Sequence, residues 1–448
     1  MKRILIGGTN SGCGKTTIVC AILAALKARG LAVSSFKCGP DYIDPMFHKS
    51  IIGADSYNLD SFFCNDNTLK HLLCENDKNS DISVIEGVMG FYDGVNGQGS
   101  AHSVSMVTGT SSVIVIDCKG ASESIGAVMK GFMDYEVPNR ISGFIFNRLP
   151  ERLVPLAKEL CERLGSRYFG FFPVNGFSLE SRRLGLVTAA EVTDLKAKTK
   201  ELGELAEKHI LLDELIAASE APLPEYIPLK VESLFKNSKP KIAVARDEAF
   251  CFIYDENIEL LRQLGCDIAY FSPIKDKMLP ENCCGLLLSG GYPELHAGEL
   301  SDNSEMLAAI KMAVTSGMPT IAECGGFMYL HDTIKTSDGR EYKMAGALSG
   351  TAYETSRLQR FGYVTLTASE DSLICEKGHR TAAHEFHYWD STDCGSCFNA
   401  KKADGREWSC IHGGKSLYAG FPHLYFYSDI SIAERFAAAC AEFGGIYG

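Results

Sequence analysis

The chain begins with Arg3-Ile4-Leu5-Ile6-Gly7-Gly8-Thr9-Asn10-Ser11-Gly12-Cys13-Gly14-Lys15-Thr16-Thr17, directly after Met1-Lys2. A short apolar run leads into a glycine-rich loop that ends in Gly-Lys-Thr, and an amphipathic stretch follows as far as Gly30. A strand, a glycine-rich loop and a helix in this order are typical of a phosphate-binding loop. The usual first glycine of that motif, five residues before Gly14, is Thr9 here, and neighbouring glycines supply the backbone freedom.

This loop is predicted to hold the phosphates of ATP through backbone N–H groups and the N-terminus of the following helix. Lys15 would bridge the β- and γ-phosphate oxygens, and Thr16 would bind Mg²⁺. The alternative is a glycine-rich turn that binds nothing, but the strand before the loop and the helix after it argue against this. The predicted ATP-binding residues are Thr9, Asn10, Gly12, Cys13, Gly14, Lys15, Thr16 and Thr17.

Further apolar runs, separated by helical stretches, follow the loop at residues 31–36, 82–85, 112–116 and 141–146. Strands that alternate with helices and are apolar along their whole length indicate a parallel sheet covered on both faces. We therefore predict an α/β fold of the P-loop NTPase type for residues 1–193.

Acidic residues follow two of these predicted strands. Glu86 ends one strand, and Asp41 lies in the segment Lys37-Cys38-Gly39-Pro40-Asp41 after another. Ligands bind at the carboxyl ends of strands in open α/β sheets, and Mg²⁺ prefers carboxylate oxygens. Glu86 and Asp41 are therefore predicted, with Thr16, as metal-binding residues. Asp44-Pro45 and Asp93-Gly94 have the composition of turns.

Residues 194–239 are predicted to form a charged helix and a proline-rich linker. A second α/β domain is predicted at residues 240–448, with strands near 241–245, 268–271, 285–288 and 320–321. From about 340 to 412 the pattern changes to aromatic-rich strands punctuated by glycine. The predicted fold class is therefore α/β with two domains.

The second domain contains Ala322-Glu323-Cys324-Gly325-Gly326, which follows a short apolar run and precedes a helical one. This order is typical of a nucleophile elbow, where a sharp turn between strand and helix exposes a reactive side chain. Cys324 is the predicted nucleophile. An inert buried thiol is the alternative, and it requires the elbow and its glycines to be accidental.

Glutamine amidotransferases of class I combine such a cysteine with a histidine base and a glycine-rich oxyanion loop. Ser289-Gly290-Gly291-Tyr292, after a strand of its own, is the predicted oxyanion loop, together with Gly325. His423, about 100 residues after the cysteine, is the predicted base. Many such enzymes carry a glutamate two residues after this histidine. That position is Tyr425 here, so the sequence leaves the orienting partner of His423 open.

The composition of the 448 residues is that of a globular protein, with 46% hydrophobic and 22% charged residues. A formal net charge of −12 argues against nucleic acid or an anionic membrane surface as partner. No apolar run approaches the roughly 18 residues of a membrane helix. The first strand begins at once, so no secretory signal is expected. The 17 cysteines, many within apolar runs, suggest the reducing cytoplasm.

Cys394, Cys397 and Cys410, with His412, have a spacing that is compatible with zinc but irregular for a known zinc module. A surface loop is the favoured interpretation, and metal binding is the alternative left open.

Six blocks together resemble the cobyrinic acid a,c-diamide synthase family over the whole chain. They are Gly39-Pro40-Asp41-Tyr42-Ile43-Asp44-Pro45, Asn58-Leu59-Asp60, Glu86-Gly87-Val88-Met89-Gly90, Gly290-Gly291-Tyr292-Pro293-Glu294, Ala322-Glu323-Cys324-Gly325-Gly326-Phe327-Met328-Tyr329-Leu330 and His384-Glu385-Phe386-His387-Tyr388. The resemblance implies a dethiobiotin-synthetase-like ligase domain fused to a triad-type amidotransferase domain. The chain departs from the family pattern at Ser289, where a third glycine is common, and at Tyr425, where a second histidine often follows the base.

The resemblance implies an ATP- and glutamine-dependent ligase that amidates the a- and c-acetate carboxylates of cobyrinic acid in cobalamin biosynthesis. An acyl phosphate would form with Mg-ATP, and ammonia released from L-glutamine at Cys324 would displace phosphate. Tyr42, Asn58 and Asp60 would border the tetrapyrrole substrate. No prosthetic group, nucleic acid or membrane partner is expected, and a homodimer is left open.

Three alternatives remain at this point. The same chemistry on nickel-sirohydrochlorin or hydrogenobyrinic acid would use the same motifs, since one sequence does not distinguish the ring or its metal. A partitioning-type P-loop ATPase switch shares the deviant phosphate loop. Such a switch has no reason to carry Cys324, His423 and Gly290-Gly291.

Overall fold

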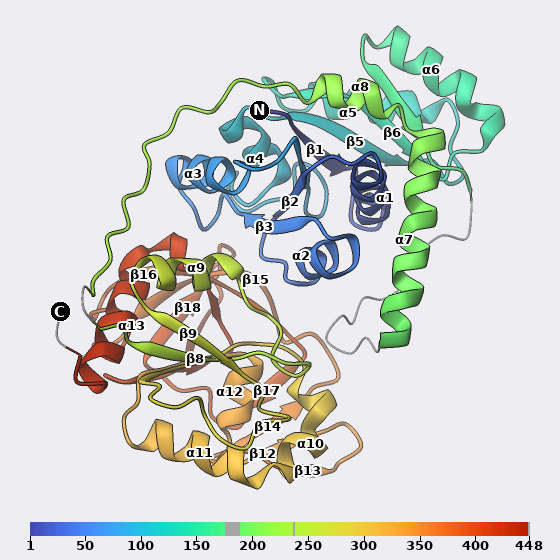
Figure 1. The fold of residues 1–448 in the computed structure, drawn as a ribbon. Coiled ribbons are helices and arrows are strands. Elements are labelled where there is room, and N and C mark those ends of the chain that lie inside the picture. Colours follow the sequence, from blue (N-terminus) through green and yellow to red (C-terminus); the bar gives the residue numbers. More distant parts are fainter. Residues whose placement is uncertain (175–188, 236–237, 447–448) are drawn as a thin grey trace. The chain divides into compact units, whose positions relative to one another are not determined.

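The computed structural model describes residues 1–174, 189–235 and 238–446, with the backbone alone for residues 189–192. The chain forms two compact units, Met1–Leu229 and Lys230–Gly448, each of which is an α/β structure (Figure 1). The predicted two-domain α/β fold is confirmed. The boundaries at 193 and 239 stay predictions. Residues 175–188 and 236–237, which fall within the predicted first domain and linker, lie outside the described residues.

The first unit is built on a seven-stranded sheet in the order β3-β2-β4-β1-β5-β6-β7, with every pair of neighbours parallel. The strands are β1 (Arg3–Gly8), β2 (Val33–Cys38), β3 (Asp55–Leu59), β4 (Ile82–Glu86), β5 (Ser111–Asp117), β6 (Ile141–Asn147) and β7 (Arg167–Phe171). β1 lies centrally, between β4 and β5, so the loop that follows it leaves the middle of the sheet. Ligands of open parallel sheets bind at such a position.

Helices cover this sheet, as the long apolar strands require. They are α1 (Lys15–Ala28), α2 (Ile43–Phe47), α3 (Asp66–Asn76), α4 (Ala101–Thr108), α5 (Ser124–Asp134), α6 (Val154–Arg163), α7 (Ala189–His209) and α8 (Leu212–Ala218), with short turns at His48–Ile52 and Glu151–Leu153. α1 and α7 lie side by side (Figure 1) and share one apolar core with β1, β4 and β5. The helical part of the segment predicted as helix and linker therefore packs on the first unit.

The second unit contains a six-stranded sheet in the order β20-β21-β11-β10-β8-β9, which is parallel except at β20. Its strands are β8 (Lys241–Ala245), β9 (Asp267–Phe271), β10 (Gly285–Leu288), β11 (Thr320–Glu323), β20 (His412–Gly413) and β21 (Leu417–Gly420). The helices are α9 (Asp255–Gln263), α10 (Ala297–Asp302), α11 (Ser304–Thr315), α12 (Gly325–Leu330) and α13 (Ile430–Phe443), with short turns at Pro293–His296 and Phe426–Ser428. Strands β8 to β11 confirm the four strands predicted from apolar runs.

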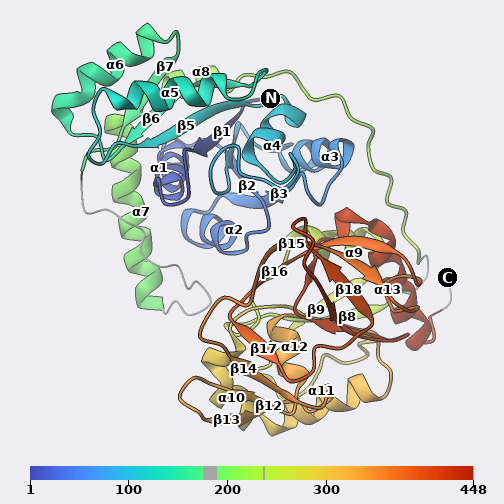
Figure 2. The ribbon, with the colours of Figure 1, turned by 180° about the vertical axis from the view of Figure 1, so that it is seen from behind.

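Two smaller sheets occupy the aromatic-rich region. One has the order β13-β12-β14-β17 and the other, antiparallel, the order β19-β18-β15-β16-β22. The strands are β12 (Thr333–Lys335), β13 (Glu341–Lys343), β14 (Thr351–Glu354), β15 (Arg360–Ala368), β16 (Arg380–His387), β17 (Trp389–Ser391), β18 (Phe398–Lys401), β19 (Glu407–Cys410) and β22 (His423–Leu424). Figure 2 shows β15, β16 and β18 in this second sheet. Because β22 pairs with β16, this sheet holds the predicted base.

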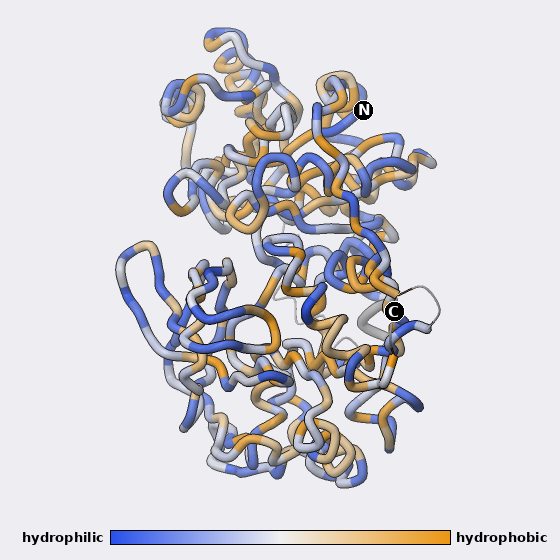
Figure 3. Tube along the Cα trace, turned by 90° about the vertical axis from the view of Figure 1, so that its left-hand side faces the viewer, coloured by the Kyte–Doolittle hydropathy of each residue, from blue (hydrophilic) through white to orange (hydrophobic). Residues whose placement is uncertain are grey.

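Hydrophobic and hydrophilic stretches alternate along both units (Figure 3). In the described part of the chain, no helix combines the length and apolar character that a bilayer span requires.

Candidate functional site: a phosphate loop and a thiol elbow

The predicted phosphate loop runs from the end of β1 to the start of α1. Thr9, Asn10 and Gly12 are at least partly exposed in it, whereas Cys13 is buried. Gly14 has a φ of 95°, and a Cβ there would lie 2.1 Å from Asn147 Nδ2, so the position requires glycine. Asn147 also donates to the carbonyl of Cys13 at 2.9 Å and thereby supports the loop from the end of β6.

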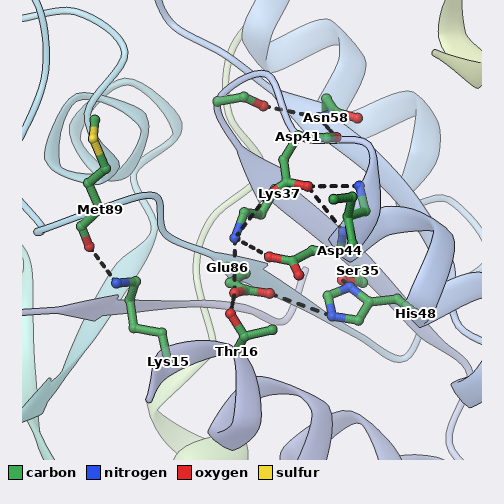
Figure 4. Close-up of polar contacts among 12 residues, drawn as sticks. Lys15, Thr16, Ser35, Lys37, Asp41, Asp44, His48, Asn58, Glu86 and Met89 are labelled. Carbon is green, nitrogen blue, oxygen red and sulfur yellow. Dashed lines mark hydrogen bonds and ion pairs between the residues drawn. The ribbon is translucent and has the colours of Figure 1, made fainter. Parts of the chain in front are cut away.

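Lys15 begins α1, and its side chain returns over the loop. Its Nζ donates to the carbonyl of Asn10 at 3.1 Å. It also donates to the carbonyl of Met89 (Figure 4). Burial lowers the pKa of Lys15. The two carbonyls therefore hold a largely buried ammonium group next to the loop, where a phosphate group would supply a stronger, charged acceptor.

The carboxyl ends of three strands bring polar side chains together beside this lysine. Lys37 of β2 is directly opposite Glu86 of β4 and Asn58 of β3 in the sheet register. Lys37 Nζ lies 2.5 Å from Asp44 Oδ2, 2.9 Å from Glu86 Oε1 and 3.8 Å from Asp41 Oδ2 (Figure 4). Thus the two predicted metal-binding carboxylates, Asp41 and Glu86, share one lysine.

Thr16 joins the same cluster. Its hydroxyl donates to Glu86 Oε1 at 2.5 Å, so all three residues predicted to bind metal lie together. Burial, followed by the charge of Asp44, raises the pKa of Glu86 to about 7. Burial lowers the pKa of Lys37, but Asp44, Glu86 and Asp41 raise it well above its usual value. Lys37 is therefore a fixed positive charge.

The predicted tetrapyrrole-binding residues border this cluster. Asn58 Nδ2 donates to the carbonyls of Gly39 and Asp41 at 3.0 and 2.8 Å. Asp60 Oδ1 accepts from the backbone N–H of Phe62 at 2.8 Å, and Tyr42 is buried. The contacts of Asn58 and Asp60 fix the backbone of the surrounding loops, so a positioning role suits these two residues as well as direct substrate contact.

In the second unit, Cys324 occupies the turn between β11 and α12. Its φ of 47° and ψ of −102° are strained for a residue with a side chain. The backbone N–H of Cys324 donates to the carbonyl of Gly420 at 2.8 Å, and its carbonyl accepts from Met328 N–H at 2.9 Å. A Cβ on Gly326 would lie 2.1 Å from the carbonyl oxygen of Leu288, so α12 approaches β10 too closely for any side chain. This is the geometry of a nucleophile elbow.

Burial, followed by the charge of Glu294, raises the pKa of the Cys324 thiol, while the backbone N–H of Gly325 acts in the opposite direction. The thiol is therefore protonated at neutral pH, and a nearby base is required to make it a nucleophile.

The predicted oxyanion loop passes beside the elbow. A Cβ on Gly325 would lie 3.1 Å from the backbone nitrogen of Gly291. The loop is fixed by Tyr292, whose N–H donates to the carbonyl of Ala249 at 2.9 Å. A Cβ on Gly290 would lie 2.6 Å from His423 Cε1, so the loop also contacts the predicted base. The structure therefore brings Gly290, Gly291 and Gly325 together with the predicted base.

His423 begins β22 and is 2% exposed. Its ring stacks on that of His384 of β16, with centroids 4.9 Å apart and planes 16° apart. Its Nδ1 lies 3.5 Å from Glu323 Oε2, a contact that the sequence did not suggest.

The cysteines considered for zinc lie elsewhere in this unit. Cys394 lies half-buried in a loop, as the favoured interpretation predicted, whereas Cys397 and Cys410 are buried next to β18 and at the end of β19. His412 Nε2 lies 3.1 Å from the carbonyl of Asp393. Among the residues that the structure describes, no group of three His, Cys, Asp or Glu side chains is arranged to hold a metal ion. Mg²⁺ bound with substrate phosphates needs only one or two protein carboxylates.

The sequence predicted no role for Lys37 or Glu323. It predicted a turn at Asp44-Pro45, but Asp44 lies in α2 and pairs with Lys37. Lys37 and Asp44 lie in the same block as Asp41 and Tyr42, the two residues of that block with predicted binding roles. The available signal was the presence of three charged residues within residues 37–45. Glu323 belongs to the predicted elbow, but nothing in the sequence around it indicates a contact with His423, 100 residues later.

The fold and the two sites define a class: a nucleotide-binding domain joined to a glutamine amidotransferase domain. Comparison with known families agrees, because residues 4–175 match the CobQ/CobB/MinD/ParA nucleotide binding domain and residues 241–429 the CobB/CobQ-like glutamine amidotransferase domain. The predicted ATP and glutamine sites thus fall in the matching domains.

Relatives of full length carry one name, cobyrinate a,c-diamide synthase. Those of Caldanaerobacter subterraneus subsp. tengcongensis, Clostridium acetobutylicum and Listeria innocua serovar 6a are 38%, 37% and 37% identical to this chain. The alignments cover 99%, 97% and 98% of this chain and 99% of each relative. The chain belongs to the cobyrinate a,c-diamide synthase family. It is a carbon–nitrogen ligase of the glutamine amidotransferase type, which confirms the predicted family and enzyme class.

Proposed function

We propose that this ligase amidates the a- and c-acetate carboxylates of cobyrinic acid, in cobalamin biosynthesis, with ATP and glutamine. The observation that carries the proposal is the match over nearly the full length to relatives named for this reaction. The presence of both a phosphate loop and a thiol elbow supports it, since the reaction needs one site for ATP and another for glutamine.

In the first unit, the proposal begins with transfer of the γ-phosphoryl group of ATP to a carboxylate of the ring. The oxygen of the carboxylate attacks phosphorus, ADP leaves, and an acyl phosphate forms. Backbone N–H groups of the loop at residues 9–14 would hold the phosphates. The Lys15 ammonium, which now contacts two carbonyl oxygens, would exchange them for phosphate oxygens and offset the charge that develops there.

The residues present fit Mg²⁺. The Thr16 hydroxyl and the carboxylates of Glu86 and Asp41 are hard oxygen donors on one edge of the sheet. Glu86 Oε2 is buried and lies 3.5 Å from His48 Nε2, and no described residue donates a hydrogen bond to it. When bound, Mg²⁺ would neutralise phosphate charge during transfer. Lys37, held at 2.5 to 3.8 Å from three carboxylates, keeps Asp41, Asp44 and Glu86 from repelling one another.

In the second unit, His423 would accept the proton of Cys324, and the thiolate would attack the carboxamide carbon of glutamine. The backbone N–H groups of Gly291 and Gly325 would stabilise the resulting oxyanion. His423 would return the proton to the leaving ammonia, and water would hydrolyse the thioester to glutamate. The ammonia would then attack the acyl phosphate in the first unit, giving the amide and phosphate.

Mass spectrometry of the products tests the choice of substrate. The purified protein would receive Mg-ATP and glutamine with cobyrinic acid, hydrogenobyrinic acid or nickel-sirohydrochlorin in parallel reactions. The proposal predicts stepwise conversion of two carboxylates on cobyrinic acid at the highest rate. Faster turnover of another ring would show that this ring, and not cobyrinic acid, is the substrate. ATP hydrolysis without an amide on any ring would contradict the proposed reaction. A cytoplasmic location stays a prediction, and a homodimer is left open.

A further inference from the structure

The amidotransferase triad lacks its usual third member at the expected position. Tyr425 stands two residues after the base, is 1% exposed, and packs its ring edge-on against Tyr254 with centroids 4.9 Å apart. A phenol in an aromatic contact supplies no carboxylate to a histidine. A histidine that acts as a base needs a partner at its second nitrogen, because that partner selects the tautomer and stabilises the imidazolium.

Glu323 meets the requirements for such a partner. Its Oε2 lies 3.5 Å from His423 Nδ1, and both side chains are buried. Its other oxygen, Oε1, accepts from the backbone N–H of Leu424 at 2.9 Å. The carboxylate is therefore anchored to the same short strand that carries the histidine, so its position relative to the ring is fixed. Contacts of this kind are often longer at rest than in the reacting complex.

Two other neighbours pack against the imidazole. His384 stacks on the face of the ring, and burial, followed by the proximity of His423, lowers the pKa of His384 well below its usual value. Gly290 lies against Cε1, the carbon between the two ring nitrogens. Packing against His384 and Gly290 therefore fixes the orientation of the ring, and the Glu323 carboxylate lies next to its Nδ1.

We propose that Glu323, the residue directly before the nucleophile, replaces the missing glutamate and positions His423. It holds the proton on Nδ1, so that Nε2 is the basic nitrogen, and it stabilises the imidazolium after the thiol proton has moved. One residue pair, Glu323-Cys324, thus supplies two members of the triad from a single strand end. This inference rests on the proposed roles of Cys324 and His423.

Glu323→Gln tests the inference because the amide oxygen still accepts from Leu424 N–H. The amide NH₂ then faces Nδ1 and favours the wrong tautomer. The glutaminase kcat is expected to fall by about 10²-fold or more, while the KM for glutamine stays within about twofold. Glu323→Asp keeps the charge and is expected to recover part of the loss.

A second readout separates positioning from damage to the fold. Alkylation of Cys324 by iodoacetamide, measured on its own peptide, is expected to slow in Glu323→Gln at neutral pH. At high pH the rates should converge, because hydroxide then removes the thiol proton without help from His423. A structural defect would reduce the rate at every pH and would overturn the inference.

Glu385→Gln is the matched control. Glu385 is also buried, and its Oε2 pairs with His387 Nε2 at 2.8 Å. The Glu385→Gln substitution removes the same charge from a different Glu–His pair in the same unit. Equal losses of glutaminase kcat in both variants would therefore contradict a specific role for Glu323. If Glu323→Gln keeps the full glutaminase kcat while Cys324→Ala is inactive, the role of Glu323 is overturned and the proposed thiol site stands. Glutaminase activity in Cys324→Ala would overturn the proposed thiol site as well.

Discussion

Glu86→Gln is expected to stabilise the first unit while it abolishes synthesis. The carboxyl of Glu86 is 0% exposed, and burial, followed by the charge of Asp44, raises its pKa from 4.5 to about 7. Each unit of pKa difference corresponds to about 1.4 kcal/mol. Holding Glu86 ionised in the folded protein therefore costs about 3 kcal/mol relative to the unfolded chain.

The pH dependence follows from the direction of the shift. Below about pH 4.5, Glu86 is protonated in both states, so the variant gains little. Between about pH 4.5 and 7 the folded wild type binds more protons than the unfolded chain, and its stability falls as pH rises. Glutamine has no such proton to lose. The free energy of unfolding of the variant should therefore exceed that of the wild type by about 3 kcal/mol above pH 7.

The amide also suits the neighbouring groups. Its oxygen can accept from Thr16 Oγ1 and Lys37 Nζ, as Glu86 Oε1 does, and Lys37 keeps Asp44 at 2.5 Å. The amide is a poor ligand for Mg²⁺ compared with a carboxylate, so synthesis should fail with either nitrogen source. The gain in stability and the loss of activity thus come from the same charge.

Hydrogen exchange resolved by peptide mass spectrometry would measure the effect, with β1, β2 and β4 reporting the first unit. Both tryptophans, Trp389 and Trp408, lie in the second unit, so their fluorescence during urea unfolding is an internal control that should not change. Glu162→Gln, the same change at an exposed position of α6, should alter stability by less than about 0.5 kcal/mol. A difference that does not vary between pH 4 and 8, or a variant less stable than the wild type at pH 8, would refute the reasoning.

Two further substitutions separate the two sites. Lys15→Ala is expected to stop synthesis with glutamine and with ammonium salts alike, because the lysine serves the phosphates, while glutaminase activity remains; ammonia-driven turnover in this variant would contradict that role. Gly290→Ala places a Cβ 2.6 Å from His423 Cε1, which forces the ring or the oxyanion loop to move. Its glutaminase kcat should fall by about 10²-fold or more, whereas synthesis from ammonium salts should be retained, and a normal glutaminase rate would show that the loop does not confine the base.

Local sequence patterns predicted the parts of each site that lie within one segment. The phosphate loop and the elbow each consist of a strand, a glycine-containing turn and a helix that are consecutive in the sequence. A short stretch of sequence was therefore enough to predict each of them. β3 escaped notice because Asp55-Ser56-Tyr57-Asn58-Leu59 mixes polar and apolar residues. It pairs with β2 at the sheet edge, and that register places Asn58 opposite Lys37.

Contacts between distant segments could not be predicted in the same way. Lys37 faces Glu86 because β2 and β4 are neighbours in the sheet, although β3 separates them in sequence. Glu323 contacts His423 because β21 pairs with β11 in the six-stranded sheet, which puts Gly420 opposite Glu323 and His423 three residues further along the chain. A sequence shows which residues can titrate, whereas strand order determines which of them meet.

The most direct test of two separate sites on one chain is synthesis by Cys324→Ala with each nitrogen source. Amide formation on cobyrinic acid would be followed by mass spectrometry with Mg-ATP and either glutamine or ammonium chloride. We expect no product with glutamine and a rate close to that of the wild type with ammonium chloride. Loss of both activities in a folded variant, or product formed from glutamine, would contradict the account.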